Sequence, residues 1–138
     1  MPLTFGFFED SNLTVPVSTL SFTFESDGST GPLDKVIYLG STDGTKTLQA
    51  VSNPGVDPIT VSVSDSAPGS GQEATAVKLA TTQAGLDTAT PGASLNLGTS
   101  ISGGTANAQP IWMRVEPNDL TVGTSTELTL TTNDVQEV

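Results

Sequence analysis

Hydrophobic and polar residues alternate with a period of two along much of the chain, and helical periodicity is nearly absent. Successive side chains of a β-strand point to opposite faces, so this alternation predicts strands with one apolar and one hydroxyl-bearing face. Two aromatic and β-branched runs, "LTFGFF" and "KVIYLGS", are further strand candidates. The alternating runs are 19–24 (TLSFTF), 59–64 (ITVSVS), 76–80 (AVKLA), 94–98 (SLNLG) and 127–132 (ELTLTT).

Turn-forming sequences separate these runs at short intervals. Pro-Gly pairs stand at 54–55, 68–69 and 91–92, and glycine suits the third corner of a turn that needs positive φ. Asp43-Gly44 lies between two strand-like runs and predicts a tight hairpin turn. Residues 71–87 combine helix-favouring alanines with an alternating pattern, and we interpret this stretch as a strand. Short strands at this spacing predict an all-β fold, an antiparallel sandwich or barrel, in one domain over 1–138.

One predicted strand, "PIWMRVEP", carries the only tryptophan and the only arginine of the chain. Ile111, Met113 and Val115 lie on one of its faces, and Trp112 and Arg114 lie on the other. Burial of an aliphatic side chain contributes about 1.5–3 kcal/mol, whereas the opposite orientation would bury a charge. We therefore expect the aliphatic set in the core, with Trp112 and Arg114 stacked on each other outside.

Trp112 and Arg114 are candidate contact residues, because tryptophan and arginine are enriched at the centres of protein interfaces. The alternative is that Trp112 only packs at a sheet edge or beneath a loop. The amino-terminal "MPLTFGFFEDS" offers two further candidates, Phe7 and Phe8. Residues 1–12 are either a first strand of the sheet or an arm that adds to a neighbouring subunit.

The composition excludes several kinds of chemistry. The chain has no cysteine, which excludes disulfides and thiolate sites, and no histidine, the usual general base near neutral pH. Fifteen acidic and four basic residues give a net charge of −11, which disfavours nucleic acid and anionic membranes as partners. With no signal peptide or membrane-spanning run, we expect a protein made in a cytoplasm and soluble there. We also expect no catalytic residues, no cofactor and no metal.

Two functions that depend on carboxylates are alternatives to that expectation. Glu9 and Asp10 could combine with Asp119 to bind calcium through oxygen ligands brought together from separate loops. A pair of carboxyl groups in a cleft could hydrolyse a glycoside. Most acidic residues fall in predicted turns, however, where aspartate commonly shapes the backbone.

The closing part of the chain resembles many bacterial and viral immunoglobulin-like domains. The similar stretch is "GTSISGGTANAQPIWMRVEPNDLTVGTSTELTLTT", residues 98–132, in which a tryptophan and arginine strand precedes a final strand of alternating Leu and Thr. The matching positions are Ile111, Trp112, Met113, Arg114, Val115, Leu128 and Leu130. The resemblance implies a single immunoglobulin-like sandwich, with a jelly roll as the alternative. The antibody type is excluded, because it requires two cysteines.

The acidic, cysteine-free and Thr/Ser/Gly-rich texture is similar to that of small accessory structural proteins of tailed bacteriophages. That resemblance implies a non-enzymatic virion component, either a capsid decoration protein or a tail protein. Its partners would be the major capsid protein or tail proteins, and it would be a homo-oligomer or present in many copies. The alternative is a carbohydrate- or calcium-binding module of a tail fibre or surface protein. A small glycan-active enzyme is a third possibility.

Overall fold

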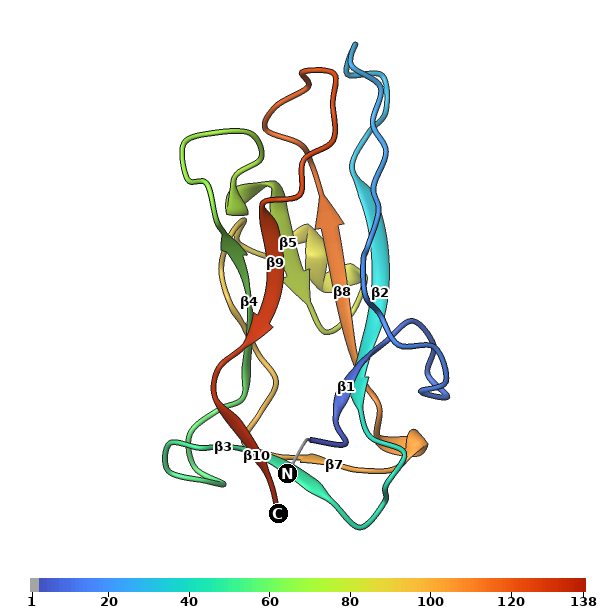
Figure 1. Ribbon diagram of the computed structural model, residues 1–138, viewed down its shortest axis with the longest axis vertical. Helices are drawn as coiled ribbons and strands as arrows, with labels where there is room; N and C mark the ends of the chain where they lie inside the picture. Colours follow the sequence, from blue (N-terminus) through green and yellow to red (C-terminus); the bar gives the residue numbers. More distant parts are fainter. Residues whose placement is uncertain (1–2) are drawn as a thin grey trace.

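The computed structural model describes residues 3–138, and within this range it contains ten β-strands and three short 3₁₀ segments. All strand pairs are antiparallel, and the sheets stack face to face (Figure 1). The predicted all-β antiparallel sandwich is therefore confirmed. No helix within 3–138 is long and apolar enough to span a membrane.

The strands form three sheets, which we name after their central strands. The β8 sheet has the order β1 (Gly6–Phe8), β2 (Leu33–Gly40), β8 (Gln109–Val115) and β5 (Val77–Ala80). The β4 sheet has the order β6 (Leu95–Asn96), β4 (Thr60–Asp65) and β9 (Leu128–Thr132). The β3 sheet has the order β10 (Val135–Glu137), β3 (Thr47–Ala50) and β7 (Ile101–Ser102).

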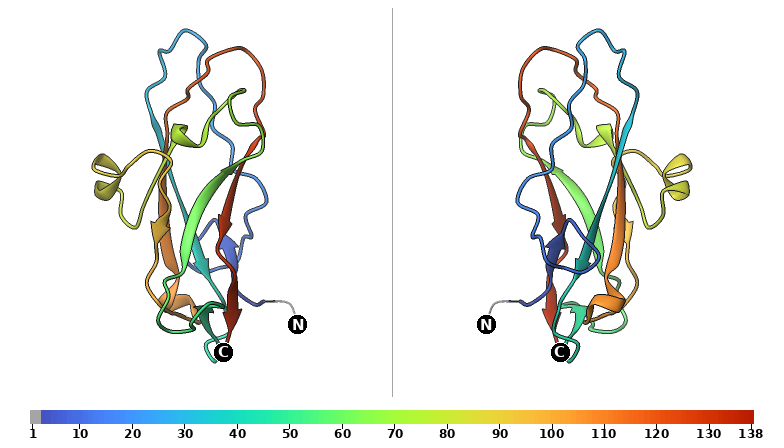
Figure 2. Two further views of the ribbon diagram at one scale, coloured as in Figure 1. Left: turned by 90° about the vertical axis from the view of Figure 1, so that its left-hand side faces the viewer. Right: turned by 90° about the vertical axis from the view of Figure 1, so that its right-hand side faces the viewer.

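The β8 sheet and the β4 sheet are the two layers of the sandwich, and the β3 sheet extends it at the lower end (Figures 1 and 2). Side chains from all three sheets meet in one hydrophobic core, in which Ile37, Leu48, Val61 and Ile111 are almost completely buried. On the β4 sheet the opposite face carries polar side chains, among them Ser62, Ser64 and Thr129, as the alternation predicted.

The prediction for the tryptophan strand is confirmed on both faces. Ile111 and Met113 are buried in the core, and Val115 packs against it. Trp112 and Arg114 are half-buried on the outer face of the β8 sheet. The Pro-Gly turns are also confirmed, because the glycine of each pair has positive φ.

The hairpin predicted at Asp43-Gly44 is wrong. β2 and β3 flank this turn but belong to different sheets, and neither turn residue has positive φ. The Asp43 carboxylate instead accepts hydrogen bonds from the backbone N–H and the hydroxyl of Thr45, at 3.0 and 2.6 Å. The side chain therefore shapes a corner that carries the chain from one sheet to another.

Two other strand predictions need correction. Residues 19–24 keep their predicted alternation, with Leu20 and Phe22 packed against the core, but they form no strand. Within 71–87 only β5 is a strand, and it is flanked by the 3₁₀ segments η1 (Ala74–Ala76) and η2 (Ala84–Asp87). The third 3₁₀ segment is η3 (Thr105–Asn107).

The two ends of the described chain are joined by hydrogen bonds. The Glu137 carboxylate accepts bonds from the backbone N–H groups of Thr4 and Phe5 and from the Thr4 hydroxyl. Ser41, which is completely buried, donates to the same Thr4 hydroxyl at 2.7 Å. Residues 1 and 2, part of the stretch interpreted as an arm or a first strand, lie outside the described residues.

Candidate functional site: the aromatic face

The outer face of the β8 sheet carries two apolar rows that cross its strands. Side chains directly opposite each other on paired strands share one face, so the register defines these rows. Phe8, Tyr38 and Pro110 form the first row, across β1, β2 and β8. Val36, Trp112 and Ala80 form the second, across β2, β8 and β5. We call these six residues the aromatic face.

Five members of the aromatic face are half-buried, and Ala80 is buried. Their side chains point away from the core, because Ile37, Leu39 and Ile111 occupy the inner face of the same strands. The face therefore exposes part of three aromatic rings on a sheet whose backbone is fixed by pairing. This arrangement can bury apolar surface against another molecule without further ordering of the chain.

A charged row borders the aromatic face, with Arg114 between Asp34 and Lys78. Arg114 Nε and Nη2 donate to the two Asp34 carboxylate oxygens at 2.8 and 3.0 Å, and Nη1 donates to Asp87 at 2.7 Å. Arginine is suited to this role, because its planar group binds a carboxylate through two parallel hydrogen bonds. The row thereby links β2, β8 and η2.

This ion-pair cluster also shifts the protonation of its members. Hydrogen bonds from Arg114 hold the pKa of the Asp34 carboxyl below its ordinary value, although partial burial acts in the opposite direction. Hydrogen bonds to Asp34 and then to Asp87 raise the pKa of Arg114 above its ordinary value. Both groups therefore remain charged throughout the physiological pH range.

The segment η2 lies on the outer side of the β8 sheet and covers part of it. It packs against β5 and β8, and in Figure 2 it projects beyond that layer. Leu86 of η2 is completely buried although it lies outside the main core, and Asp87 anchors the segment to Arg114. The exposed part of the outer face is consequently the part formed by β1, β2 and β8.

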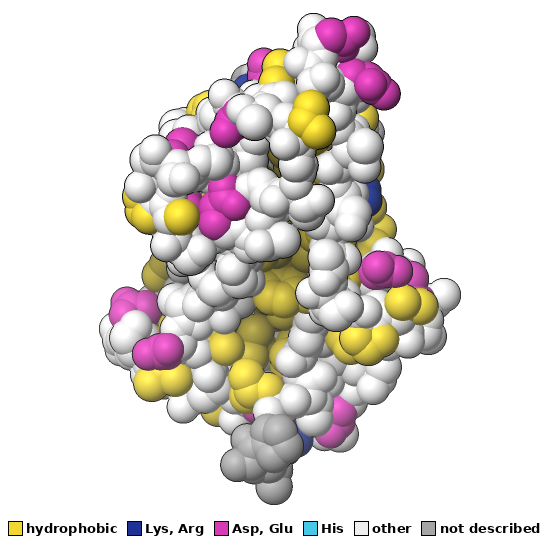
Figure 3. Space-filling view, turned by 45° about the horizontal axis from the view of Figure 1, so that its top comes forward, with side chains coloured by type: hydrophobic (Ala, Val, Ile, Leu, Met, Phe, Trp, Pro, Cys, Tyr) yellow, Lys and Arg dark blue, Asp and Glu magenta, His cyan; other side chains and the backbone are white. Residues whose placement is uncertain are grey.

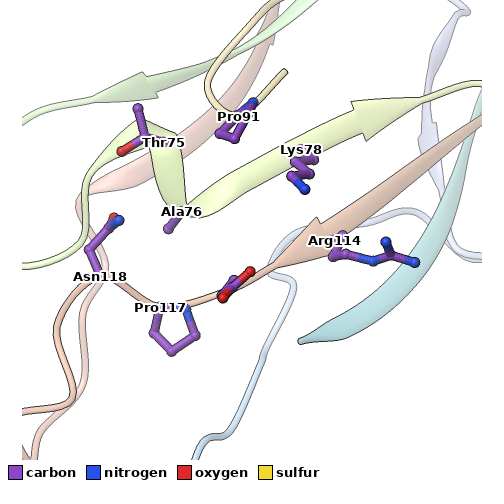
Figure 4. Close-up of a pocket in the computed structure, with 8 residues that line it drawn as sticks. Thr75, Ala76, Lys78, Pro91, Arg114, Pro117 and Asn118 are labelled. Carbon is purple, nitrogen blue, oxygen red and sulfur yellow. The ribbon is translucent and has the colours of Figure 1, made fainter. Parts of the chain in front are cut away.

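One hollow adjoins the aromatic face, and a second lies beyond its charged border. A groove of about 470 Å³ runs beside β2 and is lined by Trp112 and Val36, two acidic residues and one lysine, with Leu20 and Ile37. The charged residues of its wall are Glu9, Asp34 and Lys35. A smaller cavity of about 170 Å³ lies beyond the charged row, where Lys78 and Arg114 project from β5 and β8 beside Pro91 and Asn118 (Figure 4).

Comparisons with known proteins found no match. No protein-family model, no curated protein and no solved structure shows a significant similarity to this sequence.

The structure separates the four residues that the sequence suggested as contacts. Phe8, Trp112 and Arg114 lie on the outer face, at the aromatic face or its charged border. Phe7 pairs with Leu39 and packs against the core instead. Since Phe7 and Phe8 are neighbours on one strand, they point to opposite sides and cannot contribute to one contact surface.

The predicted stacking of Arg114 on Trp112 is replaced by other contacts. The Arg114 guanidinium is held by Asp34 and Asp87, and the cation–π contact recorded within 3–138 is Lys35 over the Phe22 ring, at 4.9 Å. Sequence analysis missed Tyr38 and Val36 as members of the outer face. A signal was present, because both alternate with Ile37 and Leu39 in "KVIYLG".

The suggested calcium ligands do not meet. Glu9 and Asp10 lie in the loop after β1, at the side of the molecule, whereas Asp119 lies in the loop between β8 and β9 at its upper end (Figure 1). Asp10 accepts hydrogen bonds from Thr14 and Val15. Within residues 3–138, no group of three or more acidic side chains is arranged to hold a metal ion.

Proposed function

We propose that this protein is a non-enzymatic structural component of a virion, which binds a capsid or tail assembly through the aromatic face. The observation that supports the proposal is the row-by-row arrangement of Phe8, Tyr38 and Trp112 on one outer sheet surface. Partly exposed aromatic residues bordered by an arginine are the composition that dominates the energy of protein interfaces.

The rigidity of the surface also supports an adhesive function. Arg114 fixes β2, β8 and η2 relative to one another, and each aromatic residue lies on a paired strand. Little conformational entropy is lost when such a surface binds. A protein that binds only the assembled particle stabilises that particle by mass action.

The virion setting rests on the resemblance in composition described above, and the partner would be the major capsid protein or a tail protein. The test uses particles purified without this protein and the purified chain added back. We expect saturable binding that Trp112→Ala and Tyr38→Ala each weaken by about tenfold or more. Val122→Ala is the matched control, because Val122 is 86% exposed but lies in a loop away from the aromatic face.

The outcome distinguishes a specific interface from nonspecific adsorption. If Trp112→Ala and Tyr38→Ala both bind as well as the parent chain, the aromatic face is not the contact surface. If the parent chain itself shows no saturable binding to capsids or tails, the virion proposal is wrong.

A carbohydrate-binding module is the second candidate, and the groove beside Trp112 favours it. The indole ring shares this groove with Glu9 and Asp34, so it offers a stacking surface together with carboxylates that can accept hydrogen bonds from sugar hydroxyls. Titration calorimetry against a glycan panel separates the two candidates. A glycan that binds the parent chain but not Trp112→Ala would favour the module over the structural component.

A further inference from the structure

The β4 sheet ends in a strand whose outer edge is open. The backbone N–H of Ser66 donates to the carbonyl of Glu127, and that of Asn133 donates to the carbonyl of Thr60. These two bonds show which residue pairs between β4 and β9 are hydrogen-bonded. In an antiparallel pair, alternate residues bond to the partner strand. Thr129 and Thr131 therefore bond to β4, whereas the N–H and C=O groups of Leu128, Leu130 and Thr132 point away from it.

A second extended segment is also unpaired. Residues 18–24 have the alternating pattern of a strand, yet within 3–138 their backbone makes no hydrogen bond to another backbone group. The segment passes beside β2 (Figure 1), where Lys35 Nζ donates to the carbonyl of Ser21. The β4 sheet therefore ends at β9, and the segment 18–24 does not extend this sheet by backbone pairing.

An apolar hollow opens on the face seen in Figure 3, where hydrophobic side chains line its floor. Partly buried side chains reach the core from both borders: Leu128 and Leu130 from β9, and Leu20 and Phe22 from the segment. A free strand edge beside exposed core side chains is the geometry that accepts an added strand.

One buried carboxylate oxygen, on β4 and so one strand in from this edge, has no partner. Asp65 pairs with Leu128 and so shares its inner face. Its Oδ1 atom accepts a bond from Ala67 N at 2.9 Å, but within residues 3–138 Oδ2 is buried without any hydrogen-bond partner. A buried carboxylate oxygen is costly unless a donor reaches it. A cationic side chain at this end of β9 would supply that donor.

We infer that the hollow binds an extended segment of a partner protein, which adds to β9 as an antiparallel strand. Alternate apolar side chains of that segment fill the hollow, and a lysine or arginine at its carboxyl-terminal end reaches Asp65. The orientation follows from β9, because the last residues of an antiparallel strand lie beside Leu128. A second copy of this chain is a poor occupant, since both copies would carry a charge of −11.

The inference rests on the proposed adhesive function and deepens it by describing the partner, but it uses a different surface from the aromatic face. The two can therefore fail separately. If the protein does not bind particles but still binds an added strand, only the virion proposal is refuted. The reverse result would refute only the added strand.

The probe is a short synthetic peptide in which valine and threonine alternate and a lysine ends the chain. Calorimetry measures its binding, and hydrogen exchange locates it. We expect the amides of Leu128, Leu130 and Thr132 to become protected on binding, because only they gain hydrogen bonds. The amides of Thr129 and Thr131 are already bonded to β4 and should change little.

Matched peptides test each part of the inference. Moving the lysine to the amino-terminal end, or replacing it by glutamate, should weaken binding. Methylating alternate backbone nitrogens should abolish it. Equal binding of all these peptides, or no binding of the lysine-ended peptide, would overturn the inference.

A pair of protein variants completes the experiment. Thr132→Pro removes an N–H group that β4 does not use, so the fold should persist while peptide binding weakens by about tenfold. Thr132→Ala keeps this N–H and should bind like the parent chain. Sedimentation tests whether a second copy of this chain is the occupant instead. A dimer that the peptide dissociates would show that a second copy fills the hollow, and the assignment to a partner protein would be wrong.

Discussion

Arg114 is the residue on which the outer face of the β8 sheet depends. It binds Asp34 on the neighbouring strand through two hydrogen bonds and holds Asp87 of η2 through a third. The side chains of Arg114 and Asp34 are only 22% and 16% exposed, so water competes weakly for the two bonds between them. Together with the buried Leu86, this side chain holds η2 on the outer face of the β8 sheet.

Asp34→Asn should make stability depend on pH in a defined way. The pKa of Asp34 is lowered in the folded protein, so its contribution is complete above the unfolded value, about 3.9, and is lost as the pH falls through the folded value. We expect the variant to be less stable than the parent chain at pH 7. The difference should shrink at acidic pH, where the parent carboxylate also becomes neutral.

Urea unfolding at several pH values measures this difference. Glu9→Gln is the control, because it removes the same charge from an exposed side chain and should show no such convergence. A stability difference between Asp34→Asn and the parent chain that stays constant down to the lowest pH would refute the assigned ion pair.

At the scale of elements, the corner between β2 and β3 depends on a close approach of two backbones. Gly103 N donates to Lys46 O at 2.7 Å, and Gly104 N donates to Ser41 O at 2.8 Å. A Cβ atom at Gly103 would lie 2.0 Å from Asp43 O. The chain can pass from one sheet to another here only because this residue has no side chain.

Gly103→Ala should therefore destabilise the protein by about 2–4 kcal/mol, because backbone atoms cannot yield as a flexible side chain would. Gly44→Ala, at the same corner, is the matched control. Its Cβ would meet nothing within 4 Å, and its φ is not positive, so we expect a change within about 0.5 kcal/mol. Thermal unfolding of both variants measures the contrast, and equal stabilities would disprove the close approach.

Sequence reasoning could predict what a single strand determines by itself. The alternation placed Ile111 and Met113 inside and Trp112 outside, because a strand has only two faces. It could not show that β2 and β3 belong to different sheets, since the turn between them has the residues of a hairpin. It also could not show that residues 19–24 stay unpaired, because pairing depends on which edge lies beside them.

The candidate site was predictable only in part for the same reason. Trp112 was identified as an outward side chain and Phe8 was named as a contact candidate together with Phe7, but the rows of the aromatic face depend on the register between β1, β2 and β8. Arg114 was expected to stack on Trp112, but it binds Asp34 of the neighbouring strand and Asp87 of a distant 3₁₀ segment. Contacts between elements far apart in the sequence leave no local pattern.

At the scale of the whole molecule, negative charge gathers at one end. The loops 25–32, 65–73 and 116–127 meet there, joined by bonds such as those between Gln72 and Asn118 and between Glu73 and Asn118. None of the four basic residues lies in these loops. Their acidic residues are Glu25, Asp27, Asp65, Glu73, Glu116, Asp119 and Glu127.

This charge distribution predicts that salt stabilises the protein. Raising the ionic strength from about 0.01 to 0.15 M shortens the screening length from about 30 to 8 Å, which weakens repulsion among the acidic residues. We expect Tm to rise, and to rise less in a variant that combines Asp27→Asn with Glu116→Gln. Calorimetric scans in sodium chloride measure both, and a Tm that falls with salt would contradict the prediction.

The bonds from Thr4 and Phe5 to Glu137 place the first and last described residues at one pole, opposite the acidic loops. Any domain fused to either end would project from that pole and leave the loops, the aromatic face and β9 uncovered. The scaffold could therefore display cargo on one side while it remains attached by another.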